Sequence, residues 1–370
     1  MNNVQICKVK DCIIKPQSNI SKIPKSEYLG NGKYPIVDQG KELIAGYTDK
    51  KELLYAGELP IVAFGDHTLY FKYVDFPFCL GADGVKVLLP KKEIHPVYFY
   101  YALMNIRMES RGYSRHYKYL LQEQIPIPPI TQQIKIASNL HKVDEVRKRA
   151  IKAQESSRAY PISLFNKMFG SLLDSEKRWD TAQVQELFDM KLGKMLSARN
   201  YTGRNLRPYL RNVNVQWDRL DLTDIKKMDF DAKEFENYKL APGDILVCEG
   251  GEVGRTAIYN GEVTDCCYQN ALHRLRIKEN SINPTYFVYF MMGASYYGLI
   301  ERETIKVTIA HFTQDRFKKL HIPLPPISLQ DEFARKVVVF KKLQESQVKT
   351  LEKLDLLFIS LSNKYFNAVS

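Results

Sequence analysis

The sequence predicts an α+β protein built from two strand-rich α/β domains, each followed by a long helix, with an internal pseudo-two-fold repeat. Three observations predict this fold class: a duplicated proline-rich phrase, a heptad pattern after each copy, and short β-branched and aromatic runs before each copy. The two long helices are expected to pair antiparallel as a coiled coil. At 370 residues the chain is long enough for two domains of ordinary size.

The duplicated phrase reads Ile-Pro-Ile-Pro-Pro-Ile at 125–130 and Ile-Pro-Leu-Pro-Pro-Ile at 322–327, with a glutamine three residues after each copy. Pro126 of the first copy corresponds to Pro323 of the second copy. The same separation relates Asn-Lys-Met-Phe at 166–169 to Asn-Lys-Tyr-Phe at 363–366. One separation shared over this distance indicates that a single unit has been duplicated.

The chain is therefore expected to contain four segments: a first domain over 1–130, a central long helix over 131–170, a second domain over 171–327 and a distal long helix over 328–370. Apolar runs at 60–65 and 244–248 predict strands inside the domains. Pro96 and Pro284 each begin a run typical of a short helix, because proline fits the first helical turn. These two prolines are closer together in the sequence than the two proline-rich phrases are, so the domains have diverged by an insertion.

Each proline-rich phrase is expected to end a domain and direct the helix that follows, because proline is excluded from helix interiors. Thr131 and Ser328 stand where an N-cap is expected. Pro161 is expected to kink or break the first helix near its end. The helices carry apolar residues at 4-3 spacing, interrupted by polar residues in the middle. This predicted seam consists of Ile136, Leu140, Val143, Phe333, Val337, Phe340, Leu351, Leu354, Phe358 and Leu361.

Net charge, cysteine spacing and hydropathy indicate the kind of partner and the cellular compartment that this chain is expected to have. A formal net charge of +12 favours a polyanionic partner such as nucleic acid, although a merely basic protein has the same surplus. The six cysteines form no C-x-x-C pair and are interpreted as reduced, mostly buried thiols. The N-terminal residues show no signal-peptide pattern, and no apolar run is long enough to cross a bilayer. We therefore expect a cytoplasmic protein without a membrane partner.

Motifs for catalysis or metal binding are incomplete. The segment 250–256 resembles a phosphate-binding loop, but it is one residue short and has arginine in place of lysine, so a glycine-rich turn that approaches DNA is the favoured interpretation. Glu249 and Glu252 could hold a metal, yet solvated loop carboxylates explain them better. The seven histidines form no i, i+4 pair, and no Asn/Asp-Pro-Pro-Tyr/Phe motif of an adenine methyltransferase occurs. We expect no catalytic residue and no metal site in this chain.

Basic and amide side chains on loops are the groups that contact phosphates and base edges. The first domain has such a cluster immediately before its proline-rich phrase, and a second candidate loop after the predicted strand at 60–65. The second domain has basic and amide side chains in three segments, 199–214, 255–256 and 306–311. The candidate DNA-binding residues are His67, Thr68, Arg111, Tyr113, Arg115, His116, Lys118, Arg199, Asn200, Tyr201, Arg204, Arg211, Asn212, Asn214, Arg255, Thr256, Lys306, Thr308 and His311.

The order of strand-rich domain, Pro-x-Pro-Pro-x-x-x-Gln phrase and long helix, repeated once, resembles the specificity subunit of type I restriction-modification systems. Further matching phrases are Trp179 ahead of 184–187, Gly-Asp-Ile-Leu at 243–246 and Gly-Gly-Glu-Val-Gly-Arg at 250–255. In the first domain, 65–68 and 81–84 match. The resemblance covers essentially the whole chain.

This resemblance implies two target-recognition domains that each read one half of a split double-stranded DNA sequence. It implies that the paired helices fix the gap and dock methyltransferase (modification) subunits, two in number, with restriction subunits joining through the complex. It also implies that this chain carries out no chemistry, and that S-adenosylmethionine, ATP and Mg²⁺ are bound by the partner subunits.

Two other functions remain open from the residues alone. One is a non-catalytic coiled-coil adaptor whose domains bind proteins. The other is a degenerate self-sufficient DNA modification enzyme. Salt-sensitive duplex binding distinguishes the first alternative from a DNA-recognition subunit, and methyl transfer by the purified chain would establish the second.

Overall fold

The computed structural model describes residues 4–14, 21–81, 84–109, 112, 114–172, 179–195, 202–279, 281–300 and 314–367. The chain forms two compact units. Unit 1 comprises Met1–Ala153 and Gln347–Ser370, and unit 2 comprises Gln154–Ser346. The predicted α+β class is confirmed. The units do not follow the four predicted segments, because each contains one strand-rich domain together with parts of the long helices.

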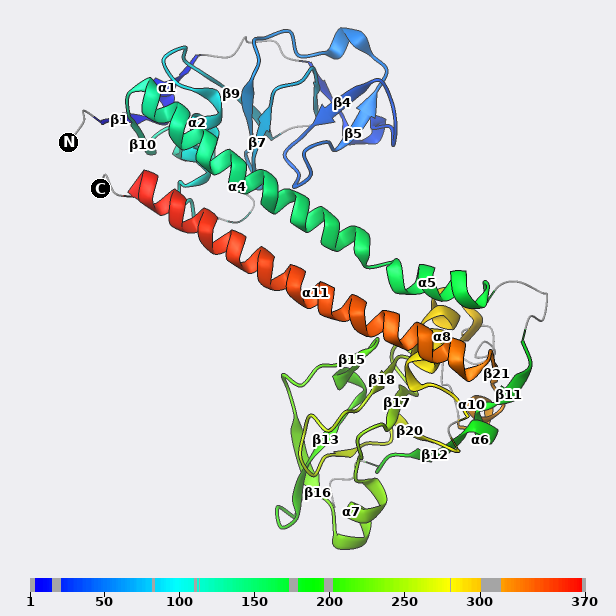
Figure 1. The fold of residues 1–370 in the computed structure, drawn as a ribbon. Coiled ribbons are helices and arrows are strands. Elements are labelled where there is room, and N and C mark those ends of the chain that lie inside the picture. The colour runs from blue at the N-terminus through cyan, green and yellow to red at the C-terminus, as the bar shows by residue number, and fades with distance from the viewer. Residues whose placement is uncertain are drawn as a thin grey trace. The chain divides into compact units, whose positions relative to one another are not determined.

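The domain of unit 1 is built around two four-stranded sheets (Figure 1). One sheet is antiparallel with the order β2-β9-β6-β7, and the other is mixed with the order β3-β8-β4-β5. The elements are β1 (Gln5–Lys8), α1 (Val9–Cys12), β2 (Ile13–Ile14), β3 (Lys22–Ile23), β4 (Tyr34–Val37), β5 (Gly46–Thr48), β6 (Ile61–Gly65), β7 (Phe71–Val74), β8 (Cys79–Gly81), β9 (Val85–Pro90), α2 (Pro96–Met104), α3 (Tyr117–Leu120) and β10 (Gln124–Ile127).

The domain of unit 2 repeats the antiparallel sheet as β12-β20-β17-β18 and has a three-stranded mixed sheet with the order β16-β13-β19. The elements are β11 (Thr181–Gln183), α6 (Val184–Leu187), β12 (Phe188–Leu192), β13 (Leu206–Leu210), β14 (Val215–Gln216), β15 (Arg219–Leu220), β16 (Lys226–Asp229), α7 (Ala232–Tyr238), β17 (Ile245–Cys248), β18 (Thr256–Ile258), β19 (Cys267–Tyr268), β20 (Leu272–Ile277), α8 (Pro284–Tyr296), α10 (Gln314–Lys318) and β21 (His321–Pro323).

The strands predicted at 60–65 and 244–248 are the central strands β6 and β17 of the repeated sheet. Every residue of each strand is buried, as expected for a short, continuously apolar run. Each strand has antiparallel neighbours on both sides, with Val62 opposite Leu88 in unit 1 and Ile245 opposite Leu275 in unit 2. The duplication therefore extends into the sheet scaffold.

The helices predicted after Pro96 and Pro284 are confirmed as α2 and α8, with proline in the first turn. Both are apolar on nearly all sides, which is typical of a helix buried between other layers. The N-caps are His95, whose side chain accepts the Tyr98 N–H, and Asn283, whose side chain accepts two N–H groups. These caps fix where each helix begins.

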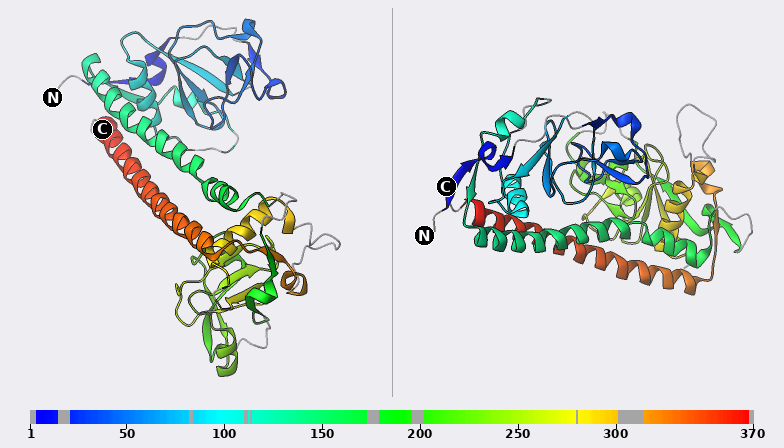
Figure 2. Two further views of the ribbon diagram at one scale, coloured as in Figure 1. Left: turned by 45° about the vertical axis from the view of Figure 1, so that its right-hand side comes forward. Right: turned by 90° about the horizontal axis from the view of Figure 1, so that it is seen from above.

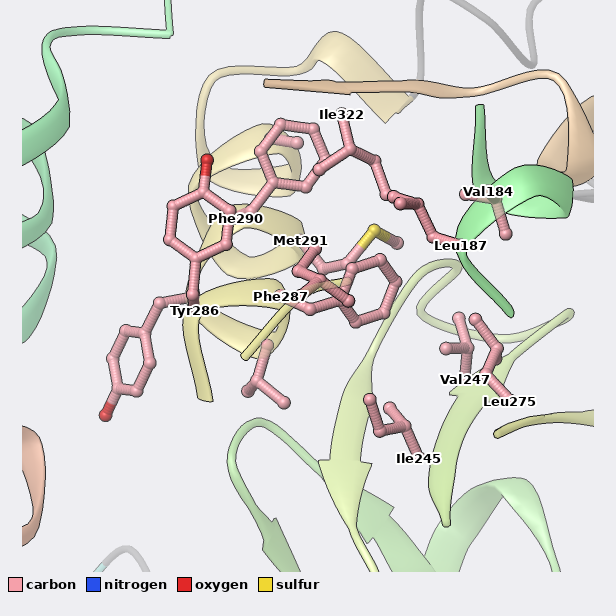
Figure 3. Close-up of a cluster of buried hydrophobic side chains, with 14 of the residues drawn as sticks. Val184, Leu187, Ile245, Val247, Leu275, Tyr286, Phe287, Phe290, Met291 and Ile322 are labelled. Carbon is pink, nitrogen blue, oxygen red and sulfur yellow. The ribbon is translucent and has the colours of Figure 1, made fainter. Parts of the chain in front are cut away.

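Helix α8 packs on the repeated sheet and forms the main core of unit 2 (Figure 3). Figure 3 shows Phe287 and Met291 among side chains from β17, β20 and α6. Phe287 is fully buried, as are Ile245 and Val247 beneath it. In unit 1 the equivalent core places α2 against β6 and β7, with Ile136, Ala137 and Leu140 of the long helix joining it.

The first long helix is interrupted as predicted. Helix α4 spans Ile130–Ser157 and α5 spans Tyr160–Phe169, with Pro161 in the first turn of α5. Proline cannot donate the N–H that would continue the α4 ladder, so the break precedes it. The second long helix, α11, is continuous over Ile327–Ser362 and is followed by a π-helical segment at Asn363–Asn367.

Both predicted N-caps are wrong by two residues. The helices begin at Ile130 and Ile327, so Thr131 and Ser328 lie inside the first turn. The carbonyls of Pro129 and Pro326 accept the first helical N–H groups instead. A carbonyl before the helix is available to proline, so the last proline of each phrase takes the capping position.

The antiparallel arrangement of the long helices is present within each unit. In unit 1, the C-terminal part of α11 lies beside α4 (Figure 2), where Asn139 Nδ2 donates to the Tyr365 hydroxyl at 3.0 Å and Arg147 pairs with Asp355. In unit 2, the rings of Tyr160 and Phe340 lie 5.1 Å apart between α5 and α11.

The residues of the predicted seam differ in burial along the helices. Its members at the domain ends of the helices are buried, and the others are partly buried, whereas the positions between them are mostly exposed. The buried members are Ile136, Leu140, Phe333 and Val337; the partly buried members are Val143, Phe340, Leu351, Leu354, Phe358 and Leu361.

Candidate nucleic-acid interface

A buried glutamine joins each domain to its long helix, and we call this arrangement the glutamine clamp. In unit 1 the Gln133 side-chain oxygen accepts the N–H of His95, the N-cap of α2, at 2.8 Å. Its amide nitrogen donates to the Pro128 carbonyl, also at 2.8 Å. One side chain therefore links the domain helix, the proline-rich phrase and the long helix.

Unit 2 repeats the glutamine clamp at the equivalent position after its own proline-rich phrase. The Gln330 oxygen accepts the Asn283 N–H at 2.9 Å, and its amide nitrogen donates to the Pro325 carbonyl at 2.7 Å. Both glutamines are 1% exposed. Because buried polar groups are costly to leave unpaired, the clamp holds each domain in a defined position on its own helix.

In unit 1 the fold brings the two predicted DNA-contact loops together. The turn that follows β6 contains Asp66, and the Asp66 carbonyl accepts the His116 N–H at 3.0 Å. The His116 ring Nδ1 lies 2.9 Å from the same carbonyl, and the Asp66 carboxylate accepts the Tyr117 N–H at 2.7 Å. His67 Nδ1 lies 3.2 Å from the Ser114 carbonyl. Residues 65–68 and 114–118 thus form one polar surface.

The candidates on this surface differ in exposure. Thr68, Arg115 and Lys118 are exposed and His67 is partly buried. His116 is 1% exposed and serves to hold the two loops together. Arg115 and Lys118 are therefore the exposed cations of this surface, and His116 lies between the two loops.

Gln39 completes this surface and is a residue that the sequence reasoning missed. Its carbonyl accepts the Thr68 hydroxyl, and its side-chain oxygen accepts the His67 N–H at 3.4 Å. A Cβ atom on Gly84, whose φ is +98°, would collide with that oxygen. In the sequence, Gln39 can be recognised only as a polar residue between the buried end of β4 and Gly40, a pattern typical of a turn.

In unit 2 the fold joins two candidate loops through Arg255 and Asn212. The Arg255 guanidinium donates to the Asn212 carbonyl at 2.6 Å and pairs with Glu252 at 3.3 Å. Within the described residues, Arg255 Nε has no hydrogen-bond partner, and the same holds for Nε of Arg211. Both Nε atoms are buried, so these unpaired donors lie inside the loops and not on their surface.

Two candidates in unit 2 are buried and support the loops from within. Thr256 is fully buried and donates to the Gly254 carbonyl at 2.7 Å. Asn214 is 2% exposed, and its side chain donates to the carbonyls of Asp221 and Asp224 at 2.9 and 3.1 Å. Neither side chain is accessible to a duplex, so both position neighbouring groups.

Arg204 is exposed on a loop held by the carboxylate of Asp229. This carboxylate accepts the Gly203 and Asn205 N–H groups at 2.8 Å each and the Thr202 hydroxyl at 3.1 Å. Burial by itself would raise the pKa of Asp229, but these hydrogen bonds to its charged form lower it below the ordinary value. An anionic Asp229 thus presents Arg204 on a defined turn.

The remaining candidates lie outside the residues that the structure describes. These are Arg111, Tyr113, Arg199, Asn200, Tyr201, Lys306, Thr308 and His311.

The glycine-rich segment is a turn between two paired strands. It connects β17, which ends at Cys248, to β18, which begins at Thr256, and no helix follows it as a phosphate-binding loop requires. Gly251 and Gly254 have φ values of +77° and +82°, which explains why glycine stands there. Burial raises the pKa of the neighbouring Cys248 thiol to about 11, against the lowering effect of Arg255, so this thiol is protonated at neutral pH.

The described part of the chain was also compared with the requirements of a metal site and of a membrane-spanning helix, and it meets neither. No group of three or more His, Cys, Asp or Glu side chains there could hold a metal ion. No helix there is both long and apolar enough to cross a bilayer.

A family model described as type I restriction modification DNA specificity domain matches residues 1–157 and 176–368. Among curated proteins, the chain is similar to a putative type I restriction enzyme MjaX specificity subunit from Methanocaldococcus jannaschii, with 23% identity over 193 residues. It is also similar to the type I restriction enzyme StySPI specificity subunit from Salmonella potsdam, with 25% identity over 183 residues. These matches cover 51% and 48% of this chain, but only 45% and 39% of the relatives' own lengths.

Two solved structures share the fold over nearly the whole chain. The S subunit of a type I restriction-modification system from M. genitalium has a TM-score of 0.61 and 17% identity, over 99% of this chain and 96% of that one. A chain from a study of complex assembly and conformational transition of the type I restriction-modification system has a TM-score of 0.57 and 15% identity, over 98% and 97% of the two chains.

Proposed function

The chain belongs to the type I restriction-modification DNA specificity family, and from this we propose that it recognises a bipartite DNA target as the specificity subunit of a type I complex. Each unit would read one half of the target. The observation that carries this proposal is that both units attach a domain with polar, cationic loops to a long helix through the same glutamine clamp.

The proposed contacts in unit 1 are Thr68, Arg115 and Lys118, with His67 at the edge of the same surface. In unit 2 they are Arg204, which is exposed, and the partly buried Arg211, Asn212 and Arg255 on neighbouring loops. His116, Asn214 and Thr256 would act by positioning these groups. The net charge of +12 supports phosphate contact.

Mapping methylated adenines in the source genome tests the proposal most directly. We expect one motif made of two short conserved blocks separated by a gap of fixed length. Duplex footprints of the purified complex should show the same two blocks. A single uninterrupted block would contradict bipartite recognition.

Substitution of the two sets of cations separates the half-sites. Arg115→Ala with Lys118→Ala should weaken binding through one half-site, whereas Arg204→Ala should weaken binding through the other. Each lost phosphate contact should reduce the slope of log affinity against log salt by about 0.9. The control is Lys336→Ala, which removes an exposed cation paired with Glu332 on α11. Equal losses from all three variants would indicate charge attraction without half-site specificity.

The long helices would set the gap between the half-sites and dock two methyltransferase subunits. Insertion of seven residues into the polar middle of both α4 and α11 preserves the heptad seam and lengthens each helix by about 10 Å. At about 3.4 Å per base pair, the recognised gap should grow by about three base pairs. An unchanged gap in the methylation map would contradict this role of the helices.

Catalysis would belong to the partner subunits, which would bind S-adenosylmethionine, ATP and Mg²⁺ and include the restriction subunits. The purified chain should bind duplex DNA without transferring a methyl group from S-adenosylmethionine. Methyl transfer by the chain alone would instead establish a self-sufficient modification enzyme.

A further inference from the structure

A two-residue turn in unit 2 carries a nearly buried carboxylate with two strong donors. Trp217 and Asp218 connect β14 to β15, and Asp218 has a φ of +58°. The Asp218 carboxylate accepts the Tyr289 hydroxyl of α8 at 2.6 Å and the Lys341 ammonium of α11 at 2.6 Å. The Asp218 side chain is 11% exposed, so loss of either donor would leave a poorly solvated charge.

The same turn is bonded to the candidate DNA-contact loop. The Asp218 N–H donates to the Thr256 carbonyl at 2.9 Å, and the Trp217 indole N–H donates to Glu252 at 2.7 Å. Glu252 in turn pairs with Arg255. Direct contacts therefore connect Lys341 on the long helix to a proposed DNA-contact side chain.

Unit 1 uses the equivalent positions differently. Aligning the two proline-rich phrases places Asp144 at the position of Lys341, and aligning Pro96 with Pro284 places Tyr101 at the position of Tyr289. The Tyr101 hydroxyl donates to the Asp144 carboxylate at 3.2 Å, and the carboxylate also pairs with Lys148 at 2.9 Å. Here the carboxylate is supplied by the long helix itself, and these contacts do not include the polar loops of the domain.

We propose that Asp218 and Lys341 are positioning residues for DNA reading by unit 2, an inference that rests on the proposed function. Asp218 holds the turn against α8 and α11, and the turn holds Glu252, which orients Arg255. A lysine on the long helix thereby controls the base- and phosphate-contacting geometry of one half-site and not of the other.

The test uses the full chain with Trp179→Phe, which leaves Trp217 as the one tryptophan of the two in the sequence. Trp217 and Glu252 line a cavity of about 650 Å³, so indole emission and acrylamide quenching report the position of the turn. Lys341→Met should shift Trp217 emission without DNA. It should also weaken binding to a duplex carrying the unit 2 half-site about ten-fold and leave the other half-site unchanged.

Lys341→Arg should restore emission and affinity, because a guanidinium also pairs with a carboxylate. Asp218→Asn should behave as Lys341→Met does. The matched control is Lys336→Met on the same helix, which should change neither readout.

The outcomes separate this inference from the proposed function. Failure of the wild-type chain to bind either half-site would overturn the proposed function and the positioning role with it. Normal wild-type binding together with unchanged emission and affinity in Lys341→Met would overturn the positioning role alone. Equal weakening at both half-sites would also overturn it, since that result indicates general loss of folding or charge.

Discussion

Units 1 and 2 hold their strand-rich domains on the long helices in the same way, but the polar contacts of the two domains differ. Both have the antiparallel sheet, the apolar helix that packs on it and the glutamine clamp. Their second sheets differ, with β3-β8-β4-β5 in unit 1 and β16-β13-β19 in unit 2, and α2 is shorter than α8. The comparison teaches that the sheet, the buried helix and the clamp are shared, whereas the loops that leave the central strands β6 and β17 at equivalent positions make different polar contacts.

The largest difference is expected at two equivalent core positions of the long helices, Phe333 and Ile136. Phe333 is fully buried against the rings of Phe165, Phe169 and Tyr289, whereas Ile136 is 9% exposed. Phe333→Ala should reduce the free energy of unfolding of unit 2 by about 3–5 kcal/mol, and Ile136→Ala should cost unit 1 about 2 kcal/mol. Hydrogen exchange resolved by unit during urea unfolding measures both. Equal losses of unfolding free energy in the two variants would contradict the expected extra stabilisation by the rings around Phe333.

The glutamine clamp should show the opposite, an equal effect in both units. Gln133→Ala and Gln330→Ala each leave a partly buried N–H and a buried carbonyl unpaired, so each should lower the stability of its own unit by about 2 kcal/mol. Urea midpoints with unit-resolved exchange provide the measurement. Lys135→Ala, at an exposed position of α4, is the control and should have almost no effect. A clear difference between the two glutamine variants would show that one clamp is dispensable.

A smaller, again symmetrical effect is expected for the equivalent tyrosines Tyr98 and Tyr286. Each hydroxyl donates to a carbonyl of the proline-rich phrase, Pro126 at 2.5 Å and Pro323 at 2.8 Å. Burial raises the pKa of both phenols, so they are protonated donors at neutral pH. Tyr→Phe should cost about 1 kcal/mol at each site, measured by thermal unfolding. A loss of stability in only one of the two Tyr→Phe variants would show that the two domains are not held on their helices in the same way.

The smallest effect is expected in acid and only in unit 2. The folded-state pKa of Asp229 lies below its unfolded value, so its contribution to stability is present above the unfolded pKa, about 3.9, and is lost as pH falls through the folded pKa. Protection of the amides of Gly203 and Asn205 should therefore decline below about pH 4, and Asp229→Asn should abolish this pH dependence. Hydrogen exchange between pH 5 and pH 2 gives the measurement, with Asp231→Asn, an exposed N-cap of α7, as control.

Local sequence patterns predicted the repeated part of each unit well. The proline pairs, the 4-3 spacing and the short apolar runs act within a few residues, and the helices, the break before Pro161 and strands β6 and β17 follow from them. The N-cap prediction was wrong because the carbonyls of Pro129 and Pro326 already accept helical N–H groups, so Thr131 and Ser328 lie inside the first turn.

The candidate site could be predicted only by residue type and by loop. The sequence predicts Arg115 and Lys118 as basic contact residues, and both are exposed, Lys118 within α3. Their neighbour His116 was selected on the same ground and is buried, because the Asp66 carbonyl that accepts its N–H lies 50 residues earlier in the chain. Gln39 was not selected, since its partners His67 and Thr68 become neighbours only after β4 and β6 have folded.

The sequence by itself determined that two copies of one unit are present, where each long helix begins to within two residues, and that the chain is a basic protein with duplicated domains. The tertiary structure alone decided which polar side chains are accessible and which support the loops, and that Lys341 meets Asp218 while its counterpart Asp144 meets Tyr101. The physical reason is the range of the interactions. Periodicity and capping depend on neighbours along the helix, whereas burial and pairing of polar groups depend on segments brought together by folding.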